Sequence, residues 1–478
     1  MGRARRVAAR AVRPFRRRSS PPSSSTGAVN ARSVEQGGSR LRDRGASKLK
    51  KPHVYKRDSH QNLYDAVDFL RMLEVERLNE HLVERVRERL LDPAEQLRVG
   101  FLVSSASRWN ADVLFDTLQR QNQFAPRIVL SAPQYRTHPR RRAAMYLDER
   151  RFFAEIDPGM IELYDPEANE VLPVEDLDFD VLFYEMPWGM KDYPRRMIGR
   201  SLNAYMHYGF MMMANHEMHY NIASFHSYLW AYFTQTEAHR RMHLQHDPSA
   251  RSKLVVTGYP KLDVYHHEPP TGADVWEAAG GERSGRRRVI YAPHHSLGRD
   301  NLGMSTFPWT HDVMLRAALE DEDVQWVYKP HPTLRFSVEK NGVMTAAEYE
   351  AYEARWDAAP NATVFDSGRY FDLFRTSDAL ITCCGSFLAE YLPTGRPIIW
   401  LVSDTTVGLN AVGRRLATGF YEVRSATELT EVFQRVVLEG DDPLASRRKE
   451  LIEELFPGDR SASEQVVEYL RDQLVPLP

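Results

Sequence analysis

Short apolar runs alternate with amphipathic stretches along most of the chain, and many of these runs end abruptly in a polar turn. Runs such as Val324–Tyr328 and Ala379–Thr382 are apolar at nearly every position, which is typical of strands that are buried on both faces. Strands of this kind that alternate with helices indicate parallel sheets. The predicted strands are Val99–Ser104, Arg127–Ser131, Val181–Tyr184, Trp230–Thr234, Leu254–Thr257, Val289–Ala292, Val324–Tyr328, Ala362–Phe365, Ala379–Thr382 and Pro397–Val402.

These strands fall into two series, which are separated by the polar, glycine-rich stretch Pro269–Arg287. A chain of 478 residues is too long for one hydrophobic core. The pattern therefore predicts an α/β fold of two Rossmann-like lobes with parallel sheets and a cleft between them. Residues 97–268 are predicted to form the first lobe, residues 269–287 a linker, and residues 288–478 the second lobe.

An amphipathic helix is predicted before the first strand, within a helical segment at residues 61–96. Glu and Arg fill its polar face, so its apolar face must pack against another element. The apolar positions are Leu63, Val67, Leu70, Leu73, Leu78, Leu82, Val86 and Leu90. Further along, Asn110 is predicted to cap a helix that runs through Leu118. The last helix is predicted at Ser463–Leu474, and the sequence leaves its packing partner open.

Residues 1–60 are rich in Arg, Ser, Pro and Gly, and they carry 17 Lys or Arg against 3 Asp or Glu. The remainder is acidic, so the net charge of the chain is only −2. This composition cannot form a core and predicts a disordered basic tail. Three interpretations stay open: attraction to an anionic membrane, a solvated tail without a specific contact, and a transit peptide. Nucleic acid is not a predicted partner, because no recognition motif accompanies the charge.

The chain has two cysteines, Cys383 and Cys384, and they are adjacent. Adjacent cysteines cannot join distant segments, so no disulfide framework is predicted, in agreement with a reducing compartment. No apolar run approaches the length that crosses a bilayer, and no secretory signal is evident at the amino terminus.

Two strand ends in the second series carry candidate phosphate chemistry. Gly385 permits close approach of a ligand to the backbone, and Ser386 stands at the start of a helix, where free N–H groups favour an anion. Glu390, one turn further, is a candidate to accept hydrogen bonds from ribose hydroxyls, or else a surface residue. Lys329 and His331 follow another strand in a proline-stiffened turn, where a cation and an imidazole suit a phosphate leaving group.

Histidines supply the remaining candidates. His294, His295 and Arg299 lie in a polar loop after a strand, and they are predicted to bind the nucleotide or its phosphates. His207 follows an apolar run and is a candidate general base, with a hydrogen-bonded core histidine as the alternative. The segment His216–Tyr220 lacks the spacing of a zinc motif, so no metal site is predicted.

Taken together and in this order, several motifs resemble bacterial CDP-glycerol glycerophosphotransferase-like proteins, in particular the branch linked to capsule and surface-polysaccharide assembly. The motifs are SSASRWNADVLFDTL (Ser104–Leu118), YEMPW (Tyr184–Trp188), AYMHYG (Ala204–Gly209), VTGYPKLD (Val256–Asp263), IYAPHHS (Ile290–Ser296), MSTFPW (Met304–Trp309), VYKPHP (Val327–Pro332) and LITCCGSFLAEYLPTGRPII (Leu380–Ile399).

The resemblance implies a GT-B architecture with the acceptor lobe first and the nucleotide-donor lobe second. It implies transfer of glycerol phosphate, or a related polyol phosphate, from a CDP-activated donor to a hydroxyl of a teichoic-acid-like or capsule polymer, with release of CMP. By position, His207 and His331 are implied to be catalytic. The family usually has His-Gly where this chain has His-Tyr-Gly, and Asp is commonest at the position of Cys383.

The expected partners are therefore a nucleotide donor, a lipid-linked or polysaccharide acceptor and, through the tail, the inner face of the plasma membrane, with a cytoplasmic location. No organic cofactor is expected, and assistance by a divalent cation is left open. Two other functions are compatible with the same architecture: a glycosyltransferase or epimerase that uses a sugar nucleotide, and a degenerate scaffold that binds nucleotide or polymer without catalysis.

Overall fold

The structure is a computed structural model. It describes residues 59–133, 139–215, 217–220, 222–266, 275–281, 285–298, 302–366, 370–456 and 460–476. The predicted basic tail, up to residue 58, and the candidate Arg299 lie outside the described residues.

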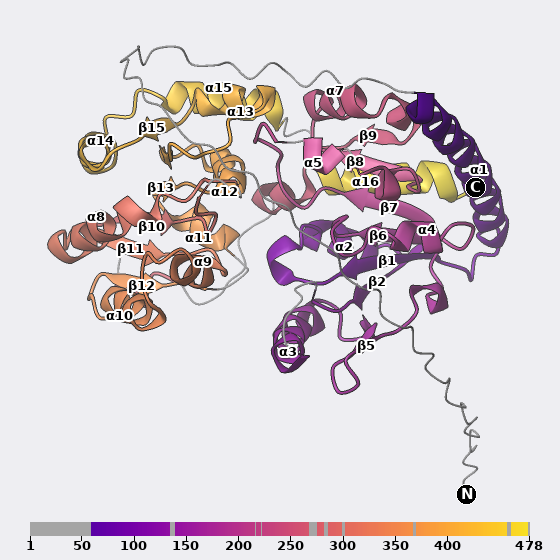
Figure 1. Cartoon of the computed structure of the whole chain (residues 1–478), viewed down its shortest axis with the longest axis horizontal. Helices are drawn as coiled ribbons and strands as arrows, with labels where there is room; N and C mark the ends of the chain where they lie inside the picture. Colours follow the sequence, from indigo (N-terminus) through magenta and orange to yellow (C-terminus); the bar gives the residue numbers. More distant parts are fainter. Residues whose placement is uncertain are drawn as a thin grey trace, which may run out of the picture. The chain divides into compact units, whose positions relative to one another are not determined.

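Two parallel sheets form the α/β fold, as the alternating pattern predicted (Figure 1). The first sheet has the strand order β3-β2-β1-β6-β7-β8-β9. Its strands are β1 (Leu97–Val103), β2 (Phe124–Leu130), β3 (Ile161–Glu162), β6 (Val181–Tyr184), β7 (Leu202–Met206), β8 (Ala231–Thr234) and β9 (Leu254–Val256), and a small hairpin, β4 (Tyr164–Asp165) and β5 (Glu170–Val171), follows β3. The helices of this part are α1 (Ser59–Arg89), α2 (Asp112–Gln119), α3 (Pro139–Ile156), α4 (Tyr193–Arg196), α5 (Glu217–Tyr220), α6 (Ala223–His226) and α7 (Glu237–His246).

The second sheet has the strand order β12-β11-β10-β13-β14-β15. Its strands are β10 (Arg287–Ala292), β11 (Val324–Tyr328), β12 (Ala362–Val364), β13 (Ala379–Thr382), β14 (Ile398–Leu401) and β15 (Tyr421–Val423). The helices are α8 (Phe307–Glu320), α9 (Leu334–Lys340), α10 (Ala346–Asp357), α11 (Phe371–Thr376), α12 (Gly385–Tyr391), α13 (Ala411–Ala417), α14 (Ala426–Val432), α15 (Ala445–Leu455) and α16 (Ala462–Leu474). The chain leaves β10 toward one edge and returns to pair β13 on its other side, so the direction of winding reverses at β10.

The sequence missed two strands of the first sheet, the two-residue β3 and the longer β7. In β7 a polar residue interrupts the apolar run. Asn203 is buried there, and its amide donates to the carbonyl oxygens of Pro194 and Tyr228 at 2.9 Å and 3.0 Å. Its side-chain oxygen accepts from the hydroxyl of Tyr184 at 2.8 Å. A buried amide is tolerated when its hydrogen bonds are made, so the strand is fully buried despite its composition.

The helix predicted near the amino terminus is present as α1, but its apolar face is narrower than expected. Leu82 and Val86 are buried in the core of the first lobe, as predicted. Leu70 and Leu73 are exposed instead, with exposed fractions of 64% and 45%. In this part of the helix the buried apolar side chain is that of Val75, which was not among the predicted apolar positions.

The last helix, α16, packs against the first lobe although it follows the second lobe in the chain (Figure 1). The carboxylate of Asp263 accepts hydrogen bonds from the N–H groups of Ala462 and Ser463 at 2.9 Å and 2.6 Å. It thereby satisfies free donors at the helix start. The residues of α16 in the first core are Val466, Val467, Leu470 and Leu474.

The predicted linker is partly core. Trp276 is fully buried, its indole N–H donates to Thr376 at 2.9 Å, and the guanidinium of Arg288 lies 5.3 Å from its ring centroid. The amide of Gln325 donates to the carbonyl oxygen of Ala279 at 3.1 Å. The described part of this stretch therefore packs on the second lobe, and the expectation of a plain linker was wrong for it.

A short segment after β7 connects the first lobe to the second through its main chain. The carbonyl oxygens of Met211 and Met212 accept from the side-chain amide and the N–H of Asn410, both at 2.8 Å. The N–H of Ala214 donates to the carbonyl oxygen of Gly408 at 2.6 Å. We call Met211–Ala214 the crossing segment.

Apolar packing reinforces the crossing segment. Met211 and Met212 belong to a hydrophobic cluster with Leu388 and Leu416 of the second lobe. At Gly413, an added Cβ would lie 2.3 Å from the carbonyl oxygen of Met212, so only glycine fits there. The two lobes therefore share one core at this point.

Replacement of Asn410 by alanine should lower the free energy of unfolding by about 2–4 kcal/mol, because the substitution leaves Met211 O unpaired and removes the N-cap that accepts from the N–H of Gly413. Urea unfolding followed by circular dichroism measures the change. Asn341→Ala is the matched control, since the Asn341 amide donates to Ser337 O on the surface and its loss should change stability by less than about 0.5 kcal/mol. Equal effects of the two substitutions would contradict the role of the crossing segment.

Candidate functional site

The candidate site lies at the carboxyl ends of the strands at the centre of the second sheet. β10 pairs in parallel with β11 on one side and with β13 on the other, so the turns that follow these three strands meet at one edge. The winding reverses here, which is the position where open α/β sheets bind ligands. The turns bring together His294 and His295 after β10, Lys329 and His331 after β11, and Gly385 after β13.

Three of the predicted residues form a tight histidine cluster, which we define as His294, His295 and His331. The ring centroids of His294 and His295 lie 4.4 Å apart, those of His294 and His331 5.0 Å, and those of His295 and His331 4.2 Å. The N–H of His331 donates to the carbonyl oxygen of Pro293 at 3.1 Å, which fixes one turn against the other. The sequence named all three residues but could not show that they touch.

Hydrogen bonds decide which ring nitrogen carries the proton in two of these histidines. The N–H of Ser296 lies 3.2 Å from Nδ1 of His294, and the N–H of Thr333 lies 3.2 Å from Nδ1 of His331. A main-chain N–H can only donate, so each Nδ1 accepts and the neutral ring has its proton on Nε2. Two Nε2–H groups are therefore available as donors.

Burial keeps the histidine cluster neutral. Desolvation, followed by the neighbouring histidines, holds the pKa of His294 well below its ordinary value. Desolvation also lowers the pKa of His295, and together with His295 and Lys329 it lowers the pKa of His331 to about 3. The pKa of Lys329 falls to about 8, chiefly through burial. The site is thus poor in negative charge and is arranged to receive an anion.

The cluster also has the spacing of metal ligands. Within the described part of the chain, one nitrogen from each of His294, His295 and His331 lies within 4.8 Å of the others. A metal ion needs an unprotonated ring nitrogen. The N–H donors at Nδ1 of His294 and His331 keep Nε2 protonated, and this hydrogen-bond pattern favours an oxyanion over a metal ion.

Lys329 lies in an aromatic cage. Its Nζ is 5.1 Å from the ring centroids of both Phe365 and Tyr370 and 5.9 Å from that of Phe387. Ring faces stabilise a cation, so the cage offsets part of the cost of burying the ammonium group.

Glu390 is engaged by partners that differ from the predicted ribose. The carboxylate is 1% exposed and accepts from the hydroxyls of Tyr259, at 3.1 Å, and Tyr370, and it pairs with Lys261 at 3.5 Å. Because the hydroxyl of Tyr259 also lies 2.8 Å from the carbonyl oxygen of Tyr208, this network links α12 to the first lobe.

Gly385 and Ser386 begin α12, as predicted, but the space beside the glycine is occupied. A Cβ on Gly385 would lie 3.3 Å from the sulfur of Met213 in the crossing segment and 3.6 Å from the terminal methyl of Met304. The hydroxyl of Ser386 lies 3.4 Å from Sγ of Cys384. The packing of Met213 therefore favours glycine at position 385, independently of any approach by a ligand.

The two cysteines are buried packing residues. Sγ of Cys383 accepts from the N–H of His294 at 3.1 Å, so a thiol fills the position where the family most often has a carboxylate. Burial raises the pKa of Cys383, and it raises that of Cys384 to about 11. Neither side chain is a thiolate at neutral pH.

His207 lies in the first lobe after β7, and it is paired with a second histidine. It is 3% exposed, and its Nε2 lies 3.2 Å from Nδ1 of His219 in α5. Nδ1 of His207 lies 2.7 Å from the carbonyl oxygen of Gly209. The N–H of Gly209 is further away, at 3.1 Å, so the shorter contact places the proton on Nδ1 and leaves the lone pair of Nε2 facing His219.

His219 is a candidate that sequence reasoning passed over. It is half-buried, whereas His207 is buried, and the ring of Trp188 lies edge-on to it with centroids 4.8 Å apart. In the sequence, the segment His216–Tyr220 lacks the spacing of a zinc motif, and the separation of His207 and His219 along the chain gives no pattern that indicates a pair. Burial and His219 hold the pKa of His207 well below its ordinary value.

Asn110 supports His207 instead of capping a helix. α2 begins at Asp112 without a side-chain cap, so the predicted role of Asn110 was wrong. Its amide donates to the carbonyl oxygen of His207 at 3.0 Å. The chain before α2 thus anchors the candidate base.

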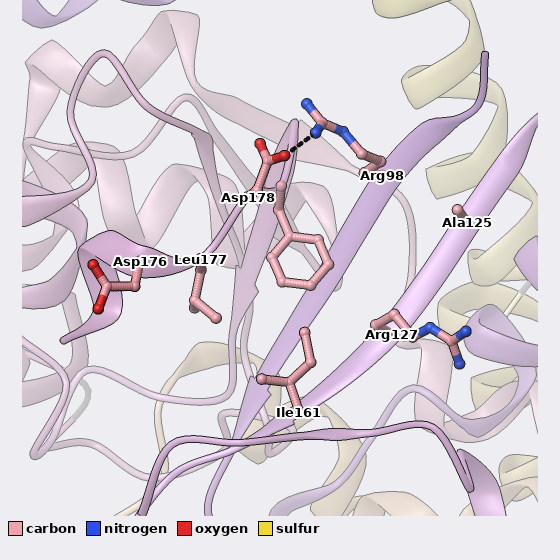
Figure 2. A pocket seen from close by; sticks show the side chains of 8 residues that line it. Arg98, Ala125, Arg127, Ile161, Asp176, Leu177 and Asp178 are labelled. Carbon is pink, nitrogen blue, oxygen red and sulfur yellow. Dashed lines mark hydrogen bonds and ion pairs between the residues drawn. The ribbon is translucent and has the colours of Figure 1, made fainter. Parts of the chain in front are cut away.

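A separate pocket lies at the amino-terminal ends of strands in the first sheet (Figure 2). It is open, and Figure 2 shows Arg98 paired with Asp178 at its rim. Its lining residues are Arg98, Ala125, Arg127, Ile161, Asp176, Leu177, Asp178 and Phe179. None of the predicted site residues lines this pocket.

Comparison with known families assigns the chain to one of them. Residues 204–468 match the family model described as CDP-Glycerol:Poly(glycerophosphate) glycerophosphotransferase, which is more than half of the chain. The chain belongs to this family. The match runs from β7 to α16 and includes His207, the histidine cluster and the Gly385 turn, so the resemblance seen in the motifs is confirmed. Family membership makes the chain a transferase with a nucleotide-derived donor. No match was found among proteins with curated descriptions.

Solved structures confirm the fold. The chain is similar to a putative UDP-N-acetylglucosamine 2-epimerase from Listeria monocytogenes, with a TM-score of 0.51, 12% identity and coverage of 79% of this chain and 96% of the epimerase. A UDP-GlcNAc 2-epimerase from Neisseria meningitidis, solved with UDP-GlcNAc, gives a TM-score of 0.50, 14% identity and coverage of 79% and 100%. At these identities the similarity establishes the two-lobed, GT-B-like fold alone. Among the described residues, no helix has the length and apolar character needed to span a bilayer.

The buried thiols should resist alkylation. With iodoacetamide at pH 8, native protein should lose little of either free thiol over an hour, because burial and a raised pKa keep Cys383 and Cys384 protonated. Mass spectrometry of the peptide counts the adducts, and protein unfolded in guanidinium should label at both positions. Rapid labelling of the native protein would contradict the buried turn.

Proposed function

We propose that this chain transfers glycerol phosphate, or a related polyol phosphate, from a CDP-activated donor to a hydroxyl of a cell-surface polymer and releases CMP. The observation that carries the proposal is the meeting of His331, His294, His295 and Lys329 at one sheet edge, inside the region that matches the glycerophosphotransferase family. The acceptor is lipid-linked or polysaccharide, and the protein works at the inner face of the plasma membrane, to which the basic tail contributes attraction.

The donor diphosphate would lie against the histidine cluster. Nε2–H groups of His294 and His331 donate to its oxygens, and Lys329 adds positive charge. As the acceptor oxygen bonds to the phosphorus that carries the polyol, the bond from that phosphorus to the bridging oxygen breaks and CMP leaves with the electron pair. Most of the catalysis is then positioning and charge stabilisation.

The diphosphate would lie at the histidine cluster and not at the start of α12, because the space beside Gly385 is occupied. Met213 and Met304 fill the space beside this glycine, and α12 has seven residues. Gly385 and Ser386 therefore shape the turn, and the imidazoles supply the donors. Glu390 would hold α12 on the first lobe through Tyr259 in this arrangement.

The proton of the acceptor hydroxyl would go to the pair of His207 and His219. His207 is buried with its lone pair toward His219, so His219 presents its Nδ1–H inward and its Nε2 as the base. When Nε2 takes the proton, the imidazolium is stabilised by the hydrogen bond to His207. This is the logic of a base that a second group orients.

A sugar-nucleotide enzyme is the second candidate. The epimerase from Neisseria meningitidis shares the fold and was solved with UDP-GlcNAc, which makes a uridine sugar nucleotide the alternative donor. A degenerate, non-catalytic scaffold is the third. The released nucleotide distinguishes all three, because these outcomes are CMP, UDP or none.

Incubation of the purified full-length protein with CDP-glycerol and a lipid-linked acceptor should release CMP, which chromatography quantifies. His331→Ala should lower the rate by about 10²-fold or more, because it removes a donor to the developing charge. His81→Ala, at an exposed position of α1, is the control and should leave the rate unchanged. UDP release from UDP-GlcNAc would establish the second candidate, and turnover that survives His331→Ala would contradict the arrangement of the site.

His219→Ala should lower kcat by about 10²-fold or more with little change in KM for the donor, because a base acts on the acceptor. His207→Gln should shift the pH profile of kcat, since it alters the group that stabilises the imidazolium of His219. A loss confined to thermal stability, with kcat and the pH profile intact, would assign both histidines to packing.

A further inference from the structure

The histidine cluster has a property that the transfer reaction does not require. Three imidazoles lie with centroids 4.2–5.0 Å apart, and Lys329 is close enough to lower the pKa of His331. A buried set of bases beside a cation remains neutral only while no negative charge is present. A bound anion favours the protonated form of the histidines instead.

We propose that the histidine cluster binds the diphosphate group of a nucleotide and takes up a proton as it does so, so that binding is coupled to pH. The proposal deepens the proposed function, on which it rests for the site's role in donor binding. The class of ligand is a diphosphate diester, in which each phosphate carries one negative charge at neutral pH.

The geometry supports a donor site whose members are held rigidly. Besides the N–H of Ser296, its hydroxyl lies 2.8 Å from Nδ1 of His294, and this hydroxyl accepts from the N–H of Met304 at 3.1 Å. The hydroxyl of Thr333 lies 3.0 Å from Nδ1 of His331. On proton uptake, the hydroxyl oxygens of Ser296 and Thr333 would accept from Nδ1–H and replace the contacts of Nδ1 with the main-chain N–H groups, while Nε2–H remains directed at the ligand.

Lys329 is the competing site of proton uptake, because its pKa of about 8 lies at the upper end of the pH range of the assay. Two of the described groups next to the histidine cluster are titratable: Lys329 and Cys383, whose thiol is protonated. The titratable groups around Lys329 are Cys384, Asp366, Lys261 and Glu390. Glu390 is already paired with Lys261 and with tyrosine hydroxyls. Among the described residues, no carboxylate contributes to the pKa shifts of His294, His295 and His331, so the ligand supplies the negative charge that raises their pKa.

The sign of the pH dependence follows. The pKa of His331 is about 3 in the empty site, and a bound diphosphate raises it. Between these two values the bound state holds more protons than the free state, so affinity falls as pH rises. For one proton taken up in full, Kd should rise about tenfold for each pH unit.

Calorimetry with CDP-glycerol, in the absence of acceptor, tests this directly. The full chain, freed of any affinity tag, is titrated between pH 6 and pH 8 in two buffers of different ionisation enthalpy. The diphosphate of this probe does not titrate in that range, so protons gained belong to the protein. We expect net proton uptake and a Kd that rises with pH. Binding without proton uptake, or no binding of any nucleotide, would overturn the proposal.

Replacement of a histidine by glutamine, which donates a hydrogen bond but does not titrate, tests which imidazole takes up the proton. His331→Gln and His295→Gln keep a hydrogen-bond donor but cannot be protonated, so each should bind with less proton uptake and a flatter pH dependence. His81→Gln is the control and should match the natural protein. Equal proton uptake in all variants would overturn the assignment to the cluster. Circular dichroism melts establish that each variant is folded.

Two further arms distinguish this proposal from the proposed function. UDP-GlcNAc that binds with proton uptake, while CDP-glycerol does not, would retain the diphosphate site and remove the CDP donor. Stoichiometric binding of Co²⁺, seen by its visible absorption and lost in His331→Gln, would identify a metal site and overturn the oxyanion assignment. We expect no such absorption, because the N–H donors at Nδ1 keep Nε2 protonated.

Discussion

The crossing segment, Met211–Ala214, is the constraint on which the rest of the site depends. Its carbonyl oxygens accept from Asn410 and its N–H donates to Gly408, while its methionines enter the second core. A main chain that is hydrogen-bonded at both ends of a short stretch cannot shift without leaving buried polar groups unpaired. The segment begins four residues after His207, so the same contacts that join the lobes restrict the position of His207 in relation to the Gly385 turn.

Desolvation lowers the pKa of histidines in both lobes. His207, His294 and His331 all have pKa values below the ordinary value of histidine, and burial is the first cause in each case. The local hydrogen bonds then give the rings different roles. Nδ1 of His207 donates to a carbonyl oxygen, which leaves a lone pair at Nε2, whereas Nδ1 of His331 accepts a main-chain N–H, which leaves a donor there. Histidine is thus a hydrogen-bond acceptor toward His219 in one lobe and a hydrogen-bond donor at the strand ends in the other.

Much of the second lobe was predictable because its signals are local. β11 and β13 are apolar at nearly every position and end in turns, so their bounds matched the sequence prediction. β7 was missed because Asn203 interrupts its pattern, and its hydrogen bonds come from segments that the local sequence does not identify. Glu390 was assigned to ribose from its helical position alone, and two of its actual partners, Tyr259 and Lys261, precede it by more than a hundred residues.

The sequence by itself determined the α/β class, the strand ends that carry Lys329, His331, His294 and His295, and, through its ordered motifs, the family. Only the tertiary structure decided that three histidines touch, that His219 pairs with His207, and that Met213 occupies the space beside Gly385. The physical reason is that strand patterns follow from the burial of neighbouring positions in the chain. Protonation and hydrogen-bond direction follow from desolvation and partners, which segments distant in the sequence supply.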